Sequence, residues 1–183
     1  PELIQAGEKL QVIARAGVGF DNIDVEEATR CGIVVVNAPT GNTTSAAEHA
    51  IALMLAVARH IPQANATLKS GLLKRSDFMG TELRGKILGI IGLGNVGSEV
   101  ARRARGLEMQ LIAYDPFISA DHARNLHVEL VPLRQILRES DFITLHIPLT
   151  KATKGLIGAK ELAMVKPTVR IINTARGGLV VEE

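Results

Sequence analysis

The stretch KILGIIGLGNVG, residues 86–97, indicates the architecture of this 183-residue chain. After Lys86, residues 87–91 form a continuous apolar run, which predicts a strand buried on both faces. Three glycines follow, Gly92, Gly94 and Gly97, in the spacing G-x-G-x-x-G. Apolar residues then recur every three or four positions from 96 to 107, which is typical of an amphipathic helix. The stretch therefore predicts a strand, a tight glycine turn and a helix in direct succession.

This succession is the phosphate-binding fingerprint of a dinucleotide site. The first glycine permits the turn, the second lets the backbone approach a pyrophosphate, and the third brings the helix close to the strand. Free N–H groups at the start of the helix then face the phosphates. Asp115 ends the next predicted strand 18 residues after Gly97, close to the ~20 that the fingerprint expects. Its carboxylate would bind both ribose hydroxyls of NAD and repel the extra phosphate of NADP. The alternative is a glycine turn that serves packing only, with Asp115 as a turn former before Pro116.

Strands and helices alternate over the rest of the chain, which predicts an α/β fold with a doubly wound parallel sheet of the Rossmann type. The predicted strands lie at 87–91, 111–114, 128–131, 142–147 and 169–172. The predicted helices lie at 96–107, 120–125, 133–139 and 159–165.

A shorter β-α-β piece precedes this alternation, with strands at 9–14 and 33–36 and a helix at 24–30. We interpret residues 1–37 as the C-terminal part of a second α/β domain that binds substrate, and residues 38–183 as the dinucleotide-binding domain. The chain lacks an initial methionine and stops just after a Gly-Gly turn. We therefore expect a fragment of a longer protein, with the dinucleotide-binding domain truncated at its C-terminal end.

Two helices are predicted between these parts, one from Thr44 to Arg59 and one from about Pro62 to before Gly71. The first is apolar on most of its sides, and such a helix is normally buried on most of its sides. We expect it to lie between two domains or between two subunits of a symmetric dimer.

Composition excludes several classes of protein. Hydrophobic residues make up 46% and charged residues 22%, as in ordinary globular proteins. The net charge is +2 and the basic residues are spread along the chain, so neither nucleic acid nor a membrane surface is an expected partner. The longest apolar run, residues 50–58, is too short to span a membrane. Cys31 is the sole cysteine, which favours a reducing compartment such as the cytoplasm. No metal site is expected.

Unusual residues gather where the predicted strands end, which is the edge at which open α/β sheets bind ligands. They are Gly92 to Gly97, Asp115, the run His146-Ile147-Pro148 and the run 174–178. Arg176 lies between Ala175 and two glycines and can reach over this edge. Its guanidinium is suited to a planar clamp on a substrate carboxylate, whereas the alternative is a surface salt bridge.

These residues closely resemble the D-isomer-specific 2-hydroxyacid dehydrogenases, from residue 9 to residue 181. Within the family they resemble most the branch that oxidises 3-phosphoglycerate in serine biosynthesis. The matching stretches are 15–24, 37–42, 78–83, 92–97, 114–116 and 173–178.

The resemblance implies a role for each matching residue. Arg176 would bind the substrate carboxylate and polarise the carbonyl. The implied NAD contacts, besides the three glycines, are Asn95, Val96, Asp115, Val18, Ile147, Pro148, Thr174 and Ala175. The implied substrate-side residues are Arg15, Gly17, Asn42 and Arg75, the last near the substrate phosphate and contributed by the neighbouring subunit. The apolar helix would lie near the dimer contact, so a homodimer or a higher homo-oligomer is expected.

The family's proton relay, a histidine paired with a glutamate, is expected beyond Glu183, and none of the five histidines of this chain replaces it. The activity is therefore expected of the intact enzyme, and the fragment alone is expected to be inactive. Two alternatives stay open. One is a dehydrogenase for another D-2-hydroxy acid, and the other is a non-catalytic binding module that senses NAD(H).

Overall fold

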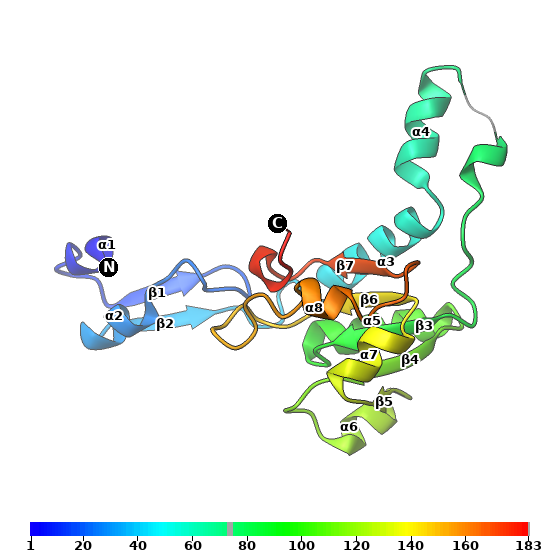
Figure 1. The fold of residues 1–183 in the computed structure, drawn as a ribbon. Helices are drawn as coiled ribbons and strands as arrows, with labels where there is room; N and C mark the ends of the chain where they lie inside the picture. The colour runs from blue at the N-terminus through cyan, green and yellow to red at the C-terminus, as the bar shows by residue number, and fades with distance from the viewer. Residues whose placement is uncertain (73–74, 183) are drawn as a thin grey trace. The chain divides into compact units, whose positions relative to one another are not determined.

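The computed structural model describes residues 1–72 and 75–182, which form two compact units, Pro1–Thr43 and Thr44–Glu183 (Figure 1). Each unit has a hydrophobic core of its own. Among the described residues, no helix is long and apolar enough to cross a membrane.

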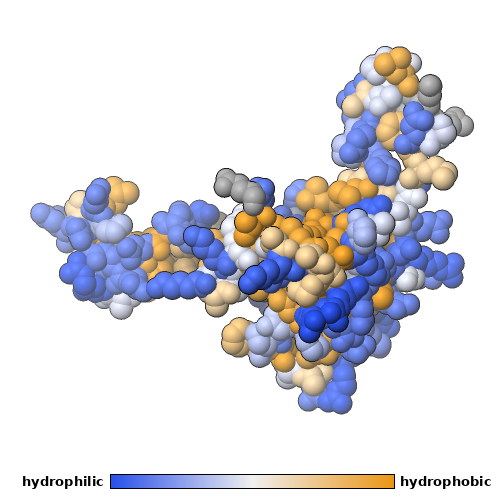
Figure 2. Space-filling view, viewed as in Figure 1, coloured by the Kyte–Doolittle hydropathy of each residue, from blue (hydrophilic) through white to orange (hydrophobic). Residues whose placement is uncertain are grey.

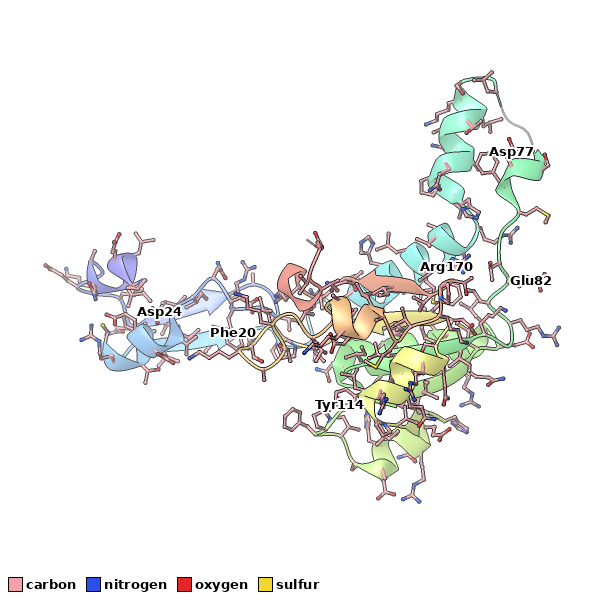
Figure 3. All side chains as sticks on the ribbon, viewed as in Figure 1. Phe20, Asp24, Asp77, Glu82, Tyr114 and Arg170 are labelled. Atoms are coloured by element: carbon pink, nitrogen blue, oxygen red, sulfur yellow. The ribbon has the colours of Figure 1, made fainter. Side chains whose placement is uncertain are left out.

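The first unit is a two-stranded parallel sheet with two short helices. Val12 pairs with Val34 and Arg15 with Asn37, so the two strands end at the same edge. Asp24 caps the second helix by accepting a hydrogen bond from the Glu27 N–H at 2.9 Å (Figure 3). In chain order the elements are α1 (Glu2–Gln5), β1 (Val12–Arg15), α2 (Val25–Arg30) and β2 (Val34–Asn37).

One face of this small sheet has no cover among the described residues. Val12, Val34 and Val36 are exposed on it, whereas Ile13 and Val35 pack on the other face against a small core. Parallel sheets are normally covered on both faces. The first unit therefore presents the kind of apolar face that a larger domain buries.

The second unit contains five parallel strands in the order β5-β4-β3-β6-β7. This order, with the first strand in the middle, is that of a doubly wound sheet and confirms the predicted fold class. The strands are β3 (Ile87–Ile91), β4 (Gln110–Tyr114), β5 (Glu129–Leu130), β6 (Phe142–Leu145) and β7 (Arg170–Asn173). The helices are α3 (Thr43–Ala58), α4 (Ile61–Lys69), α5 (Asn95–Gly106), α6 (Ala120–Asn125), α7 (Leu133–Glu139) and α8 (Ala159–Leu162), with the short 3-10 turns η1 (Arg75–Phe78) and η2 (Gly177–Leu179).

Two hydrophobic clusters cover the two faces of this sheet. Alternation along β3 sends Leu88 and Ile90 into a cluster with α3, α5 and α6, and sends Ile91 into a cluster with α7. All four residues of β6 are buried, as expected for a central strand. The continuous apolar runs in the sequence therefore reflect burial on both faces.

Asp141 fastens the amino ends of the central strands. One of its carboxylate oxygens accepts from the Ile87 N–H at 2.9 Å, and the other contacts the Lys166 ammonium at 2.8 Å. Burial raises the pKa of this carboxyl, but the contacts with Lys166 and Ile87 outweigh burial and hold the pKa below its ordinary value.

In the first unit, β1 begins at Val12, three residues after the predicted start. In the second unit, three elements are shorter than predicted. β6 ends at Leu145 instead of residue 147, because Pro148 follows closely and has no N–H to continue a ladder. β5 has only two residues, since a strand at the edge of the sheet has one neighbour to pair with. α8 ends at Leu162, three residues short of the prediction, where the chain turns before Pro167.

α3 has one buried and one exposed apolar stripe. Ala47, Ala50 and Met54 lie in the core, but Leu53 and Val57 are 38% and 47% exposed. Within the second unit, the sheet therefore covers one stripe of the helix. Burial of the other stripe, between two domains or between two subunits, stays a prediction.

Residues 59–80, here called the arm, belong to the second unit, and the two ends of the arm meet beside the sheet. The Thr81 N–H donates to the Ala58 carbonyl at 2.8 Å, and a side chain on Gly80 would meet that carbonyl and Arg59. None of the nine residues of α4 is buried, and α4 stands off the sheet in Figure 1. Hydrophobic side chains gather at its outer end in Figure 2, where Leu68 and Leu72 are exposed.

Candidate active site

The carboxyl ends of four parallel strands meet at one edge of the large sheet. β3 runs into Gly92, β4 into Asp115, β6 into His146 and β7 into Thr174. The structure therefore brings together, at one edge, the cofactor residues that the sequence predicted for the second unit, with Arg176 three residues after the end of β7.

Each glycine of the fingerprint has a separate structural reason. Gly92 adopts a φ of +92°, and a Cβ on it would lie 2.6 Å from the His146 carbonyl. A Cβ on Gly97 would lie 2.0 Å from the Gly92 carbonyl, so helix and turn touch backbone to backbone. Gly94 faces open space, with no heavy atom within 4 Å of the place a Cβ would take. Packing explains the first and third glycines, whereas the second leaves room for a ligand.

The first turn of α5 offers donors to that ligand. Gly94 is the N-cap residue and supplies no side chain to cap the helix. The first N–H groups of the helix, including those of Asn95 and Val96, therefore have no acceptor within the helix and lie at its positive end. A pyrophosphate in the space above Gly94 would satisfy them. The residues present thus fit the phosphates of NAD.

Asp115 holds two backbone N–H groups and can still accept from a ligand. One carboxylate oxygen accepts from the Phe117 N–H at 2.9 Å, as a turn former does, and the other accepts from the Leu93 N–H at 2.8 Å. The side chain follows Tyr114 (labelled in Figure 3) at the end of β4 and is half-buried. Each oxygen keeps a lone pair for a further donor, so the carboxylate can accept from ribose hydroxyls while it holds the glycine turn.

His146 lies at the same edge but is not suited to proton transfer at neutral pH. Burial lowers its pKa to about 4, so the imidazole is neutral there. Its Nε2 lies 2.9 Å from the Thr144 hydroxyl. Ile147 follows and packs beside Gly92, and the exposed Pro148 accepts a hydrogen bond from the Thr153 hydroxyl at its carbonyl. This stretch forms one wall of the site.

The turn after β7 is held by Asn173, a residue to which the sequence analysis assigned no role. Its amide donates to the Arg176 carbonyl at 2.7 Å, and its oxygen accepts from the Ala175 N–H at 3.1 Å. The Arg176 guanidinium donates to the Ala175 carbonyl at 2.7 Å. Among the described residues, the buried Thr174 hydroxyl has no hydrogen-bond partner, which leaves it able to bind a ligand atom. A single asparagine thus closes the turn that presents Arg176.

The remaining predicted residues lie in the first unit or outside the described side chains. The Arg15 Nε donates to the Gly19 carbonyl at 3.1 Å, and the Val18 carbonyl accepts from the Asn37 amide at 2.8 Å. The Gly17 carbonyl accepts from the Ala38 N–H, and Asn42 is exposed. Arg15 ends β1, Gly17 and Val18 follow it, and Asn42 follows β2. The side chain of Arg75 lies outside the described part of the structure.

A second set of contacts that sequence reasoning missed lies behind the glycine turn. The buried Ser98 hydroxyl contacts the Leu93 carbonyl at 3.1 Å and His122 Nε2 at 3.0 Å. Ser98 directly follows Gly97, but His122 comes 24 residues later on another helix. No local pattern in the sequence signals this pairing.

Comparison with known proteins agrees with the geometry. Residues 51–183 match the family model described as "D-isomer specific 2-hydroxyacid dehydrogenase, NAD binding domain". The chain is 56% identical over 182 residues to the D-3-phosphoglycerate dehydrogenase of Synechocystis sp., covering 100% of this chain and 33% of that protein. It is 57% identical over 181 residues to the enzyme of that name from Archaeoglobus fulgidus, covering 99% and 34%.

A solved structure shows the same fold. The D-lactate dehydrogenase from Aquifex aeolicus, complexed with NAD and lactic acid, superposes with a TM-score of 0.89 at 33% identity, over 98% of this chain and 54% of that one. The chain spans about a third of the length of the curated relatives it matches. The match to the family model over most of the chain confirms both the resemblance and NAD as the cofactor. The chain belongs to the D-isomer specific 2-hydroxyacid dehydrogenase family and carries its NAD-binding domain.

Proposed function

We propose that the chain is the cofactor-binding part of an enzyme that oxidises 3-phosphoglycerate to 3-phosphohydroxypyruvate, the reaction that opens serine biosynthesis. The observation that carries this proposal is the identity of more than half of the residues with proteins named D-3-phosphoglycerate dehydrogenase. Arg15, on the small sheet, supports a phosphorylated substrate because it adds a cation to the substrate side. Arg75 is assigned to the same phosphate.

The chemistry divides between cofactor and protein. NAD, held by the residues around the glycine turn, would supply the acceptor for the hydride that leaves C2 of the substrate. Arg176 binds the substrate carboxylate through two parallel N–H groups and stabilises the carbonyl as it forms. The hydroxyl proton goes to a general base, which we assign to a histidine–glutamate pair of the longer enzyme. His146 is unsuited to this task, because its pKa is about 4 and its Nε2 contacts Thr144.

The binding residues divide between the two units in the same way. The proposed NAD contacts of the second unit are Gly92, Gly94, Gly97, Asn95, Val96, Asp115, Ile147, Pro148, Thr174 and Ala175. Val18 is a further NAD contact, from the first unit, and Gly17 and Asn42 join Arg15 as substrate-side residues. Residues 1–37 then belong to a substrate-binding domain, which the uncovered apolar face of the small sheet supports.

The enzyme is proposed to be a homodimer or a higher homo-oligomer. Leu53 and Val57 on α3 are exposed, and so are Ile61 and Leu68 on α4. An isologous contact between two copies would bury these side chains from both. Cys31 is the only cysteine and is free, which suits the reducing cytoplasm.

Steady-state kinetics with a chain of the relatives' full length test the function. We expect NAD-dependent oxidation of 3-phosphoglycerate with kcat/KM at least tenfold above that for D-glycerate or D-lactate. A higher kcat/KM for an unphosphorylated acid would favour the second candidate, another D-2-hydroxy acid, which the likeness to a lactate dehydrogenase supports. NAD binding without turnover on any of these acids would favour the binding module.

A further inference from the structure

Ser98 has two partners that determine where its hydroxyl proton lies. Its side chain is 6% exposed, and its Oγ lies 3.1 Å from the Leu93 carbonyl and 3.0 Å from His122 Nε2. A serine hydroxyl has one proton, and a carbonyl oxygen can only accept. The proton therefore points to Leu93, and Ser98 Oγ must accept a hydrogen bond from His122. It follows that His122 carries a proton on Nε2.

This chain of hydrogen bonds ends in the glycine turn. Leu93 lies between Gly92 and Gly94 and is fully buried. Its N–H donates to Asp115 at 2.8 Å, and its carbonyl accepts from Ser98. Side chains therefore bind both backbone polar groups of Leu93. Asp115, after the end of β4, binds the N–H, and Ser98 on α5 binds the carbonyl. His122 on α6 contacts Ser98.

We propose that His122 is a positioning residue for the NAD site: by donating to Ser98 it orients the hydroxyl that fixes the Leu93 carbonyl, and it thereby keeps the Gly92–Gly97 turn in the shape that binds pyrophosphate. The proposal rests on the assignment of NAD to this turn. Preorganisation of a binding loop raises affinity because less ordering is needed when the ligand arrives. His122 contributes through Ser98 without touching the phosphates.

A serine beside a histidine also suggests a nucleophile and its base, but the geometry opposes that interpretation. An activated serine donates its proton to the histidine, whereas Ser98 donates to a carbonyl and accepts from the imidazole. Its hydroxyl is also buried under the turn. The pair therefore has a structural role in cofactor binding.

The test measures NAD affinity by titration of the 183-residue chain and four variants. His122→Leu removes the donor, and we expect the dissociation constant to rise three- to tenfold, the range of one lost hydrogen bond. His122→Gln keeps an N–H at a similar reach and should bind within twofold of the wild type. Ser98→Ala should weaken binding at least as much as His122→Leu, and the double variant Ser98→Ala/His122→Leu should bind no more weakly than Ser98→Ala, because both changes break the same chain of bonds.

Nitrogen NMR of the imidazole in the cofactor-free chain provides a readout independent of binding. We expect a proton on His122 Nε2 in the wild type, and an unprotonated Nε2 would overturn the proposal. Equal NAD affinity in the wild type and in a folded His122→Leu variant would also overturn it, while leaving the NAD site in place. A wild-type chain that does not bind NAD would instead refute the site assignment, and with it this proposal.

Discussion

At the edge of the large sheet where the carboxyl ends of the strands meet, the Leu93 N–H donates a hydrogen bond of 2.8 Å to the Asp115 carboxylate. The residue to which we assign the choice of cofactor therefore also supports the turn to which we assign the binding of its phosphates. A change at Asp115 alters both functions at once, and their effects can be separated by comparing the two cofactors.

The wild-type chain should bind NAD at least tenfold more tightly than NADP, because the Asp115 carboxylate repels the 2′-phosphate. Tenfold corresponds to about 1.4 kcal/mol, which one like-charge contact can supply. Asp115→Asn keeps an oxygen for the Leu93 N–H but removes the charge, so we expect the ratio of the two affinities to fall towards one. Titration with both cofactors measures it. Equal affinities in the wild type would refute this role of Asp115.

Gly94→Ala and Gly97→Ala form a matched pair. A methyl group on Gly94 enters open space, so the melting temperature should change little while NAD affinity falls at least tenfold, because the methyl occupies the place of the pyrophosphate. A methyl group on Gly97 would lie 2.0 Å from the Gly92 carbonyl, so stability and affinity should fall together. Thermal unfolding and NAD titration of both variants check this. Unchanged NAD affinity in Gly94→Ala would place the phosphates elsewhere.

Acid should destabilise the chain through His146. The pKa of His146 is about 4 in the folded state and about 6.5 in the unfolded state. Between these pH values the unfolded chain is protonated at His146 and the folded chain is not. The free energy of unfolding should therefore fall as the pH drops from about 6.5 to about 4, by at most roughly 3 kcal/mol. Urea unfolding at a series of pH values should show this slope.

His146→Gln should remove most of that slope, since glutamine does not titrate. Asp141→Asn is the control. The pKa of Asp141 is lowered, so the stabilisation that its carboxylate provides is lost only at more acidic pH. This variant should therefore keep the slope between pH 6.5 and 4. An unchanged slope in His146→Gln would show that another group is responsible.

Arg176→Lys, in a chain of the relatives' full length, keeps the charge but loses the planar fork that binds a carboxylate through two bonds. We expect KM to rise and kcat/KM to fall by about 30- to 1000-fold, or about 2–4 kcal/mol. NAD affinity and melting temperature should stay at the values of the wild-type enzyme. A surface salt bridge would give the reverse pattern, a modest loss of stability with normal kinetics, and that result would remove Arg176 from the active site.

The exposed apolar side of α3 predicts the effect of polar changes on assembly. The double variant Leu53→Ser/Val57→Ser should shift light scattering at micromolar concentration from dimer to monomer, while the melting of the sheet changes little, because neither side chain lies in the core. Ala47→Ser, on the buried stripe, is the control and should lower stability instead. A wild-type chain that is monomeric, with intact domains, would contradict the dimer.

The fold of the second unit could be predicted because its signals are local. The apolar run at β3, the glycines and the helix of α5 follow one another directly, and Asp115 stands where a short strand must end. The supports of the site could not be predicted in this way. His122 on α6 contacts Ser98 on α5, 24 residues earlier in the chain. Asn173 donates to the Arg176 carbonyl, and this contact depends on the backbone conformation of the turn, which the sequence pattern does not indicate. For α3, periodicity reports which faces are apolar, but it does not identify what covers them.

The hydrogen bond between Thr81 and Ala58 makes the arm an insertion whose two ends are already joined. Loop-closure entropy grows only slowly with length, so lengthening, shortening or replacing residues 59–80 costs the sheet little stability. An insertion or deletion within the arm can therefore change the reach of α4 while the glycine turn and the strand ends around it keep their places.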